Sequence, residues 1–171
     1  NKATVDQDGT DNTVKQTTYA PNSNSGQNVN AEQIGNTNLS NQTINAGYTN
    51  SFNSYQEGAD NEVLQIMAAN HSHGDVYQKG DDNYASQNFT GSNHPYNGSI
   101  NIDQIGDDNV AYQTYTGGGL GASQKWDIWQ EGDFNMATQI SDGKGNDLDI
   151  YQLGDNNTAY QNASGTYDFA D

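Results

Sequence analysis

A ten-residue pattern, Gln-x-Gly-x-x-Asn-x-x-x-Gln, recurs seven times along the 171 residues of the chain. The copies are QDGTDNTVKQ (7–16), QIGNTNLSNQ (33–42), QEGADNEVLQ (56–65), QKGDDNYASQ (78–87), QIGDDNVAYQ (104–113), QEGDFNMATQ (130–139) and QLGDNNTAYQ (152–161). The spacing inside the pattern never changes, whereas the first Gln residues of successive copies lie 22 to 26 residues apart. A constant unit with variable intervals is typical of a repeat protein whose outer loops are free to vary.

The residues on either side of each arc-forming x-Gly-x-x segment alternate in character with a period of two. Ile100, Ile102 and Gln104 share one parity before the glycine, and Ala111 and Gln113 share one parity after it. Side chains two positions apart lie on the same face of a β-strand, so each unit predicts a strand, a tight arc and a second strand. The glycine supplies the backbone conformation that such an arc needs.

Two strands and two turns in each repeat predict one coil of a β-solenoid. The expected fold is all-β and amyloid-like, with seven strand–arc–strand coils forming two parallel, in-register sheets in a single domain over residues 1–171. Strands of neighbouring coils lie about 4.7–4.8 Å apart, which gives a rod of roughly 33 Å. Loops rich in Gly, Ser and Asn, such as 90–98 and 116–123, are expected between strands. The repeats are expected at about 3–22, 29–48, 52–70, 74–92, 98–117, 124–142 and 146–164.

Stacked coils place matching amide side chains above one another. Each carboxamide carries donors and acceptors, so a continuous ladder satisfies groups that would be costly if buried alone, and it also fixes the register. The expected ladder of first glutamines is Gln7, Gln33, Gln56, Gln78, Gln104, Gln130 and Gln152. The expected asparagine ladder is Asn12, Asn38, Asn61, Asn83, Asn109, Asn135 and Asn157. The expected ladder of closing glutamines is Gln16, Gln42, Gln65, Gln87, Gln113, Gln139 and Gln161. The arc glycines are Gly9, Gly35, Gly58, Gly80, Gly106, Gly132 and Gly154.

The composition is consistent with such ladders. Only 31% of the residues are hydrophobic and the formal net charge is −17, which alone would favour disorder. The charged fraction is only 16%, however, so most of the polarity comes from neutral residues that can hydrogen-bond in stacks.

The charge pattern and the missing residue types exclude several classes of function. The cations are Lys2, Lys15, Lys79, Lys125 and Lys144, with no arginine, so neither nucleic acid nor an anionic membrane surface is an expected partner. No cysteine is present, which rules out disulfides and thiolate metal sites and suits an extracellular protein. No apolar run reaches transmembrane length, so an integral membrane protein is not expected. No convergent catalytic constellation, cofactor site or metal site can be named, and we expect no enzyme.

The motif resembles the curlin repeat. The resemblance covers residues 3 to about 163 and includes an alanine two residues after the asparagine in the last four copies, namely Ala85, Ala111, Ala137 and Ala159. The closing Gln falls two residues earlier than in enterobacterial members, as in NVAYQ (109–113), which indicates a distant branch. The resemblance implies a secreted subunit of curli, the functional amyloid fibres of bacterial biofilms. It further implies export through outer-membrane secretion machinery and assembly with a nucleator subunit. Because the last repeat is complete, the major subunit is favoured over the nucleator for this chain.

The ends of the repeat array bear on assembly. Only six residues precede Gln7 and the segment after the last motif is short, so we expect terminal coils without capping elements. Uncapped coils present unpaired backbone groups, and a head-to-tail contact between them does not close. The sequence therefore predicts a homopolymer that grows head to tail into a filament. That the filament is extracellular and serves biofilm formation, adhesion and aggregation is what the resemblance to the curlin repeat implies.

Acidic residues gather in the arcs. Asp81, Asp107, Asp133 and Asp155 follow the motif glycine in the last four copies, and Asp60, Asp82 and Asp108 occupy the next position. One interpretation is a solvated acidic edge that keeps the monomer soluble, with the four aspartates after the glycines as gatekeepers. The other is a column that responds to protons or to Ca²⁺, which prefers oxygen ligands.

Two further groups have a functional and a structural interpretation. Outward aromatics precede the first Gln in several copies and favour either cross-strand stacking or lateral bundling and glycan adhesion; they are Tyr55, Tyr77, Trp129 and Tyr151. His71 and His73 have no obvious third ligand, so a loop pair is favoured over a metal site.

Three alternatives to the fibre subunit remain. A polysaccharide lyase on a β-helix needs basic residues that this chain lacks. A monomeric solenoid that binds carbohydrate or ice is the main rival, although the outward positions Thr13, Leu39, Glu62 and Tyr84 begin no threonine ladder. Within the curlin resemblance, the minor nucleator subunit is the third.

Overall fold

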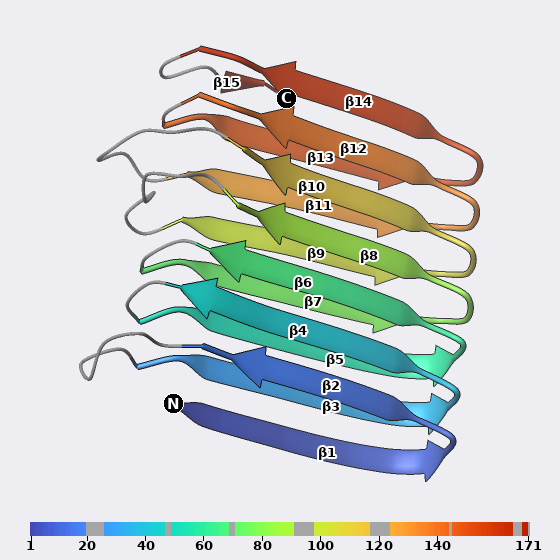
Figure 1. Cartoon of the computed structure of the whole chain (residues 1–171). Coiled ribbons are helices and arrows are strands. Elements are labelled where there is room, and N and C mark those ends of the chain that lie inside the picture. The colour runs from blue at the N-terminus through green and yellow to red at the C-terminus, as the bar shows by residue number, and fades with distance from the viewer. Residues whose placement is uncertain are drawn as a thin grey trace.

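The computed structural model describes residues 1–19, 26–46, 49–68, 71–90, 98–116, 124–143, 145–165 and 169–170. Most of the two expected loops, namely residues 91–97 and 117–123, lies outside these ranges, as do Lys144 and the ends of several expected repeats. Within the described residues every regular element is a β-strand, and the strands form two parallel sheets (Figure 1). The part of the chain that the structure describes contains no helix with the length and apolarity required to cross a membrane.

The odd-numbered strands form one sheet and the even-numbered strands form the other. The first sheet contains β1 (Lys2–Thr10), β3 (Asn28–Asn36), β5 (Ser51–Ala59), β7 (His73–Lys79), β9 (Ser99–Ile105), β11 (Lys125–Glu131), β13 (Asp147–Leu153) and β15 (Phe169–Ala170). The second sheet contains β2 (Thr13–Thr18), β4 (Leu39–Ala46), β6 (Glu62–Ala68), β8 (Tyr84–Phe89), β10 (Val110–Tyr115), β12 (Met136–Ser141) and β14 (Thr158–Ala163).

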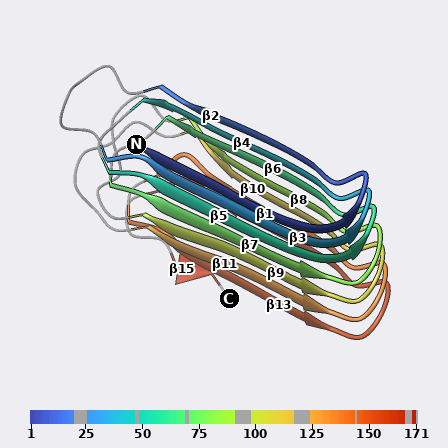
Figure 2. The ribbon, with the colours of Figure 1, turned by 90° about the horizontal axis from the view of Figure 1, so that it is seen from below.

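Each coil is an odd strand, an arc and an even strand. The arcs all lie along one side of the molecule, with the N-terminus and β14 at opposite ends of the stack (Figure 1). Viewed along another direction, the two sheets run side by side over their whole length (Figure 2). The fold is the predicted all-β solenoid of stacked strand–arc–strand coils with two parallel sheets.

Both sheets are in register with respect to the sequence pattern. In the first sheet Gln56 pairs with Gln78, and in the second sheet Gln87 pairs with Gln113. The same correspondence holds at each neighbouring pair from β1 to β14, although the intervals between motifs differ in length. Register is preserved because a slip of one residue would turn every inward side chain to the outside.

The apolar core consists of two columns between the sheets. The column nearer the arcs contains small and branched side chains, and the column nearer the loops contains larger ones. The first comprises Val63, Val76, Ala85, Ile102, Ala111, Ile128, Ala137 and Ile150. The second comprises Val29, Ile44, Phe52, Met67, Phe89, Ile100, Tyr115, Trp126, Leu148 and Ala163.

One pair in the larger column differs from the rest. Phe52 pairs in register with Gly74, and a Cβ on Gly74 would lie only 2.7 Å from Cε1 of the Phe52 ring. The missing side chain of Gly74 thus makes room for the ring. Further along the same column, Trp126 is fully buried, and its Nε1 donates to the backbone carbonyl of Asn146 at 3.1 Å.

The arcs owe their shape to two residues with positive φ. The motif glycine has φ of +116° at Gly106, and a Cβ there would lie 2.3 Å from the carbonyl oxygen of Gly132 in the next coil. The second residue after each glycine is left-handed, as at Asp82 with φ of 57°. Asp and Asn tolerate this region better than most residues. Phe134, with φ of 58°, holds the same conformation without that advantage.

Candidate functional site

The first glutamines form a continuous hydrogen-bonded row inside the solenoid. From Gln7 to Gln152, each Nε2 donates to Oε1 of the next glutamine toward the C-terminus at 2.7 to 3.0 Å. The members between the two ends are fully buried. Because every bond runs in the same sense, the row has a direction.

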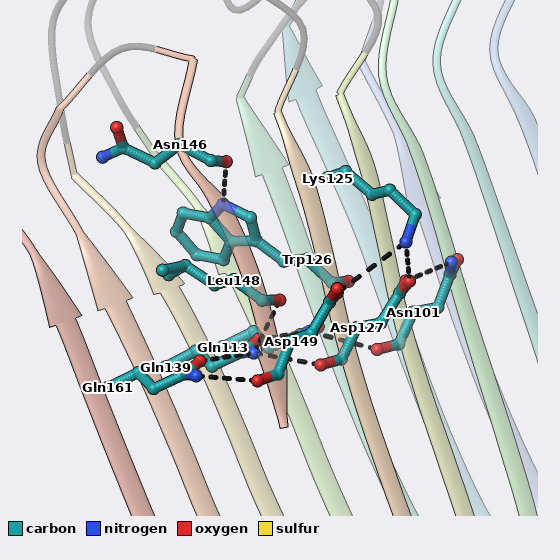
Figure 3. A network of polar contacts seen from close by, with 10 residues as sticks. All are labelled: Asn101, Gln113, Lys125, Trp126, Asp127, Gln139, Asn146, Leu148, Asp149 and Gln161. Carbon is teal, nitrogen blue, oxygen red and sulfur yellow. Dashed lines mark hydrogen bonds and ion pairs between the residues drawn. The ribbon is translucent and has the colours of Figure 1, made fainter. Parts of the chain in front are cut away.

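The closing glutamines form a second row with the same direction. From Gln16 to Gln161, each Nε2 donates to the next Oε1 at 2.8 to 3.1 Å. These amides also join the two sheets, as Nε2 of Gln139 donates to the carbonyls of Leu148 at 2.8 Å and Asp127 at 3.0 Å (Figure 3). Each interior amide therefore satisfies its neighbours along the axis and the backbone across the core.

The asparagines form a third row that runs the opposite way. From Asn38 to Asn157, both the backbone N–H and Nδ2 donate to Oδ1 of the preceding asparagine, the side-chain bonds measuring 2.9 to 3.2 Å. The same Nδ2 also reaches forward to the carbonyl of an arc glycine, as from Asn83 to Gly106 at 2.7 Å. The asparagine thereby anchors each arc to the arcs on both sides.

A fourth polar column was not predicted from the sequence. Position −6 from each first glutamine holds a polar or small residue that is buried in every coil but the first; the residues are Asn1, Gln27, Asn50, Ser72, Gly98, Gln124 and Asn146. The Oδ1 of Asn50 accepts the backbone N–H of Ser72 at 3.0 Å, and Oε1 of Gln27 accepts that of Asn50 at 3.2 Å. The constant offset from the motif was the available signal, but the varying residue type concealed it.

The arc aspartates interact with the backbone as well as with one another. The Oδ1 of Asp107 accepts the backbone N–H of Asp81 at 2.8 Å, and Asp81, Asp133 and Asp155 make the equivalent bond to the preceding arc at 2.7 to 3.0 Å. These bonds offset part of the repulsion expected of stacked carboxylates. At the next position, partial desolvation and the carboxylates of Asp108 and Asp60 raise the pKa of the exposed Asp82.

The outward aromatics of the first sheet form two separate stacks. Tyr55 and Tyr77 stack with ring centroids 5.0 Å apart, and Trp129 and Tyr151 stack at 4.1 Å. Asp103 lies in the same column between Tyr77 and Trp129 and interrupts the row.

Charged and polar pairs occupy the neighbouring outward columns of the first sheet. Asn101 donates to Asp127 at 2.8 Å, and Lys125 lies 2.5 Å from the same carboxylate and 3.7 Å from Asp149 (Figure 3). His73 pairs with Asp75 at 2.6 Å.

The His73–Asp75 pair shifts the pKa of both its members. The hydrogen bond to Asp75 raises the pKa of His73 against the effect of burial. Burial raises the pKa of Asp75, but the hydrogen bonds from His73 and Asn53 lower it by more, so the pKa of this carboxyl lies below its ordinary value. Among the described residues, no cluster of three His, Asp or Glu side chains is placed to hold a metal ion.

The two ends of the stack present open strands. β1 is exposed along nearly its whole length, including Val5 at 50% exposure. At the other end a hollow of about 380 Å³ is lined by the buried Ile150 and the partly buried Ala159, among others. β15 pairs with only two residues of β13, Asp147 and Leu148, and so covers a small part of that edge.

No family model, curated protein or solved structure matches the chain. Fold and ladders together define its class, a parallel β-solenoid repeat protein with a hydrogen-bonded amide interior.

Proposed function

We propose that the chain is the structural subunit of an extracellular functional amyloid fibre of the curli type, which assembles head to tail. The observation that carries the proposal is the direction of the three amide rows. Each row ends with donors at one terminal coil and acceptors at the other, so the two ends of the molecule are complementary.

The glutamine rows supply the first half of this complementarity. In the last coil Nε2 of Gln152 donates to the carbonyl of Met136 at 3.1 Å, and the direction of the row aims it at a further coil. In the first coil Oε1 of Gln7 accepts no hydrogen bond from any described residue. A second molecule stacked on the last coil would bring these two groups together.

The asparagine row supplies the opposite half. Within the described residues, Oδ1 of Asn157 has no following asparagine to donate to it, and Asn12 has no preceding Oδ1 to receive its N–H groups. Stacking one molecule on another joins the two and restores the pattern of the interior coils. Contact between two like ends would offer no such continuation, because the parallel strands and the amide rows of one molecule would run against those of the other, which disfavours closed dimers.

Apart from Asp147 and Leu148, whose edge β15 already occupies and would have to leave, the remaining surfaces of the junction also match. Val5 would face Ile150 and continue the apolar column. In the arcs Asp155 would meet Thr10, which carries no charge, so the column of carboxylates does not cross the junction.

The resemblance to the curlin repeat supplies the biological setting of the proposal. We infer secretion to the cell surface, with a nucleator subunit and the outer-membrane secretion machinery as partners, and a fibre that serves biofilm formation, adhesion and aggregation. No cofactor or catalytic role forms part of this function.

Dilution of the full chain from denaturant tests the proposal. Thioflavin fluorescence and electron microscopy should report unbranched fibres, and fibre diffraction should give spacings near 4.8 Å and about 10 Å. Monomers that remain soluble for days at tens of micromolar would overturn the fibre and favour a monomeric binding solenoid instead.

A monomeric carbohydrate- or ice-binding solenoid is the second candidate because aromatic rings point outward from the first sheet, with Tyr151 exposed and Tyr55, Tyr77 and Trp129 half-buried. The second sheet lacks the flat threonine ladder that ice binding requires: its outward column pairs Thr13, Leu39, Glu62, Tyr84, Val110, Met136 and Thr158 in register.

A further inference from the structure

A groove crosses the outer face of the first sheet above β9. It encloses about 380 Å³ and is lined by Asp75, Asn101, Asp103, Asp127, Ile128 and Trp129. In one outward column the short side chain of Asp103 on β9 lies between the larger side chains of Tyr77 on β7 and Trp129 on β11. It lies within one chain, so it does not depend on assembly.

One aromatic ring, that of Trp129, lines the groove, and a second, that of Tyr77, lies in the same outward column on the other side of Asp103. Trp129 packs one face of its ring on Tyr151, so its other face is turned toward β9. Tyr77 packs on Tyr55, so its free face is turned toward β9 from the opposite side. Strands two apart are separated by about 9.6 Å, which is room for one planar group between two rings but not for two.

The carboxylate between these rings lacks a counterpart. Asp75 is paired with His73, and Asp127 is paired with Lys125. By contrast, no described residue donates a hydrogen bond to Asp103 or forms an ion pair with it, although its side chain is half-buried. Burial and the charges of Asp127 and Asp75 raise the pKa of Asp103, so the site is short of positive charge.

We propose that this groove binds a guanidinium group, which stacks between Trp129 and Tyr77 and pairs with the carboxylate of Asp103. A guanidinium is planar and positively charged, donates two parallel hydrogen bonds to a carboxylate, and stacks on aromatic faces. The oxygen of the Asn101 side chain offers a further acceptor on the floor of the groove. The chain contains no arginine of its own, so the group must come from another molecule.

Other ligand chemistries fit the groove less well. The described carboxylates do not converge in a cluster that could hold a metal ion. An acidic sugar would meet three carboxylates. A neutral sugar would donate hydroxyl hydrogen bonds to Asp103 but would not neutralise its charge.

Titration calorimetry with the full chain tests the site. The probes are agmatine, a peptide acetyl-Gly-Arg-Gly-amide, its lysine analogue and its citrulline analogue. The arginine peptide or agmatine should bind at least about tenfold more tightly than the lysine peptide, which is charged but not planar, and than the citrulline peptide, which is planar but neutral. A preference for the peptide assigns the site to a partner protein, whereas a preference for agmatine assigns it to a small amine. Equal binding of all the peptides would overturn the proposal.

Variants locate the binding. Asp103→Asn should weaken guanidinium binding by about tenfold or more, because it removes the charge and keeps the shape. The matched control is Glu32→Gln, which removes a charge from the same outward column but lies between Asp6 and Tyr55, away from the groove. An equal loss in both variants would reveal diffuse attraction to an acidic surface and would exclude a site at Asp103. Circular dichroism of each variant verifies that the fold is retained.

Discussion

At the scale of the residue, the unusual feature is a buried amide whose hydrogen bonds satisfy its neighbours, which an apolar side chain at the same position would leave without partners. Gln104 accepts from Gln78 at 2.9 Å, and it donates to Gln130 at 2.9 Å and to the carbonyl of Tyr84 at 3.1 Å. Removing one such side chain leaves its partners buried and incompletely bonded. A break at one position therefore costs more than the loss of a single hydrogen bond.

Gln104→Leu is expected to destabilise the fold by roughly 2–4 kcal/mol, because the neighbouring glutamines each lose a buried partner. The midpoint of urea unfolding, followed by circular dichroism, measures the effect. The control is Gln7→Leu in the exposed first coil, where water replaces the lost bond and the expected change is below about 1 kcal/mol. Equal losses at the two positions would show that burial of the amide is irrelevant.

Two arc glycines provide a second matched pair. Gly106→Ala should destabilise by more than the roughly 1–3 kcal/mol of an unfavourable φ, because its Cβ would also lie 2.3 Å from the carbonyl oxygen of Gly132. Gly154→Ala should lose only the conformational part, since the nearest atom to its Cβ, Nδ2 of Asn157, is 3.8 Å away. Urea midpoints of the two variants compare them directly, and a larger loss at Gly154 would contradict the close approach of the arcs.

Residue types alone revealed which amides stack but not how they bond. A carboxamide both donates and accepts, so the sequence is equally consistent with rows running in either direction. The opposed directions of the glutamine and asparagine rows depend on how each side chain leaves its strand. The bond from Asp107 to the N–H of Asp81 was also hidden, because it depends on the shape of the arc.

At the scale of the element, the arc is the part with the strongest charge. The raised pKa of Asp82 means that the folded chain takes up a proton more readily than the unfolded chain. Stability from this group therefore increases as pH falls through the raised pKa, and neutral pH leaves the repulsion in place. Salt should weaken the same repulsion, because the side chain is exposed.

Asp82→Asn should raise the urea midpoint at pH 7 and reduce the stability that the parent gains at this position between pH 7 and about pH 4.5. The same variant should shorten the lag of assembly at pH 7. Asp11→Asn is the control, because Asp11 holds the same arc position beside the uncharged Thr37. A parent and an Asp82→Asn variant with identical pH dependence would refute a repulsive arc.

The strands themselves were the most predictable elements. A period of two on both sides of each motif identifies segments β1 to β14 as strands and predicts which of their side chains point inward. Ile102 and Ala111 are examples, since both are fully buried. The column at position −6 was missed because Asn50, Ser72 and Gly98 share little beyond polarity or small size. β15 was also missed, since it follows the last motif and belongs to no repeat.

At the scale of the whole molecule, the rod has two different ends, which the proposed head-to-tail junction would bring together. A charge placed on an inward side chain of the first coil would remain in water in the monomer and would become buried at the proposed junction. Such a substitution separates folding from growth.

Val5→Asp should leave the folded monomer nearly intact, because Val5 is 50% exposed, and should slow fibre elongation by at least about tenfold, because a junction would bury an unpaired carboxylate. Thr13→Asp is the control, since it adds the same charge to the same coil on an outward, exposed position. Seeded thioflavin kinetics measure both. Normal elongation of the Val5→Asp chain would exclude the proposed junction.

Coils that share one sequence pattern allow a specific misfolding: a folding chain could skip a whole coil, and every amide would still find a matching partner. The ring of Phe52 over the vacancy at Gly74 removes that freedom at one level, because any other coil would offer the ring a side chain. This single contact between a large side chain and a glycine therefore specifies which two of the otherwise interchangeable coils are neighbours.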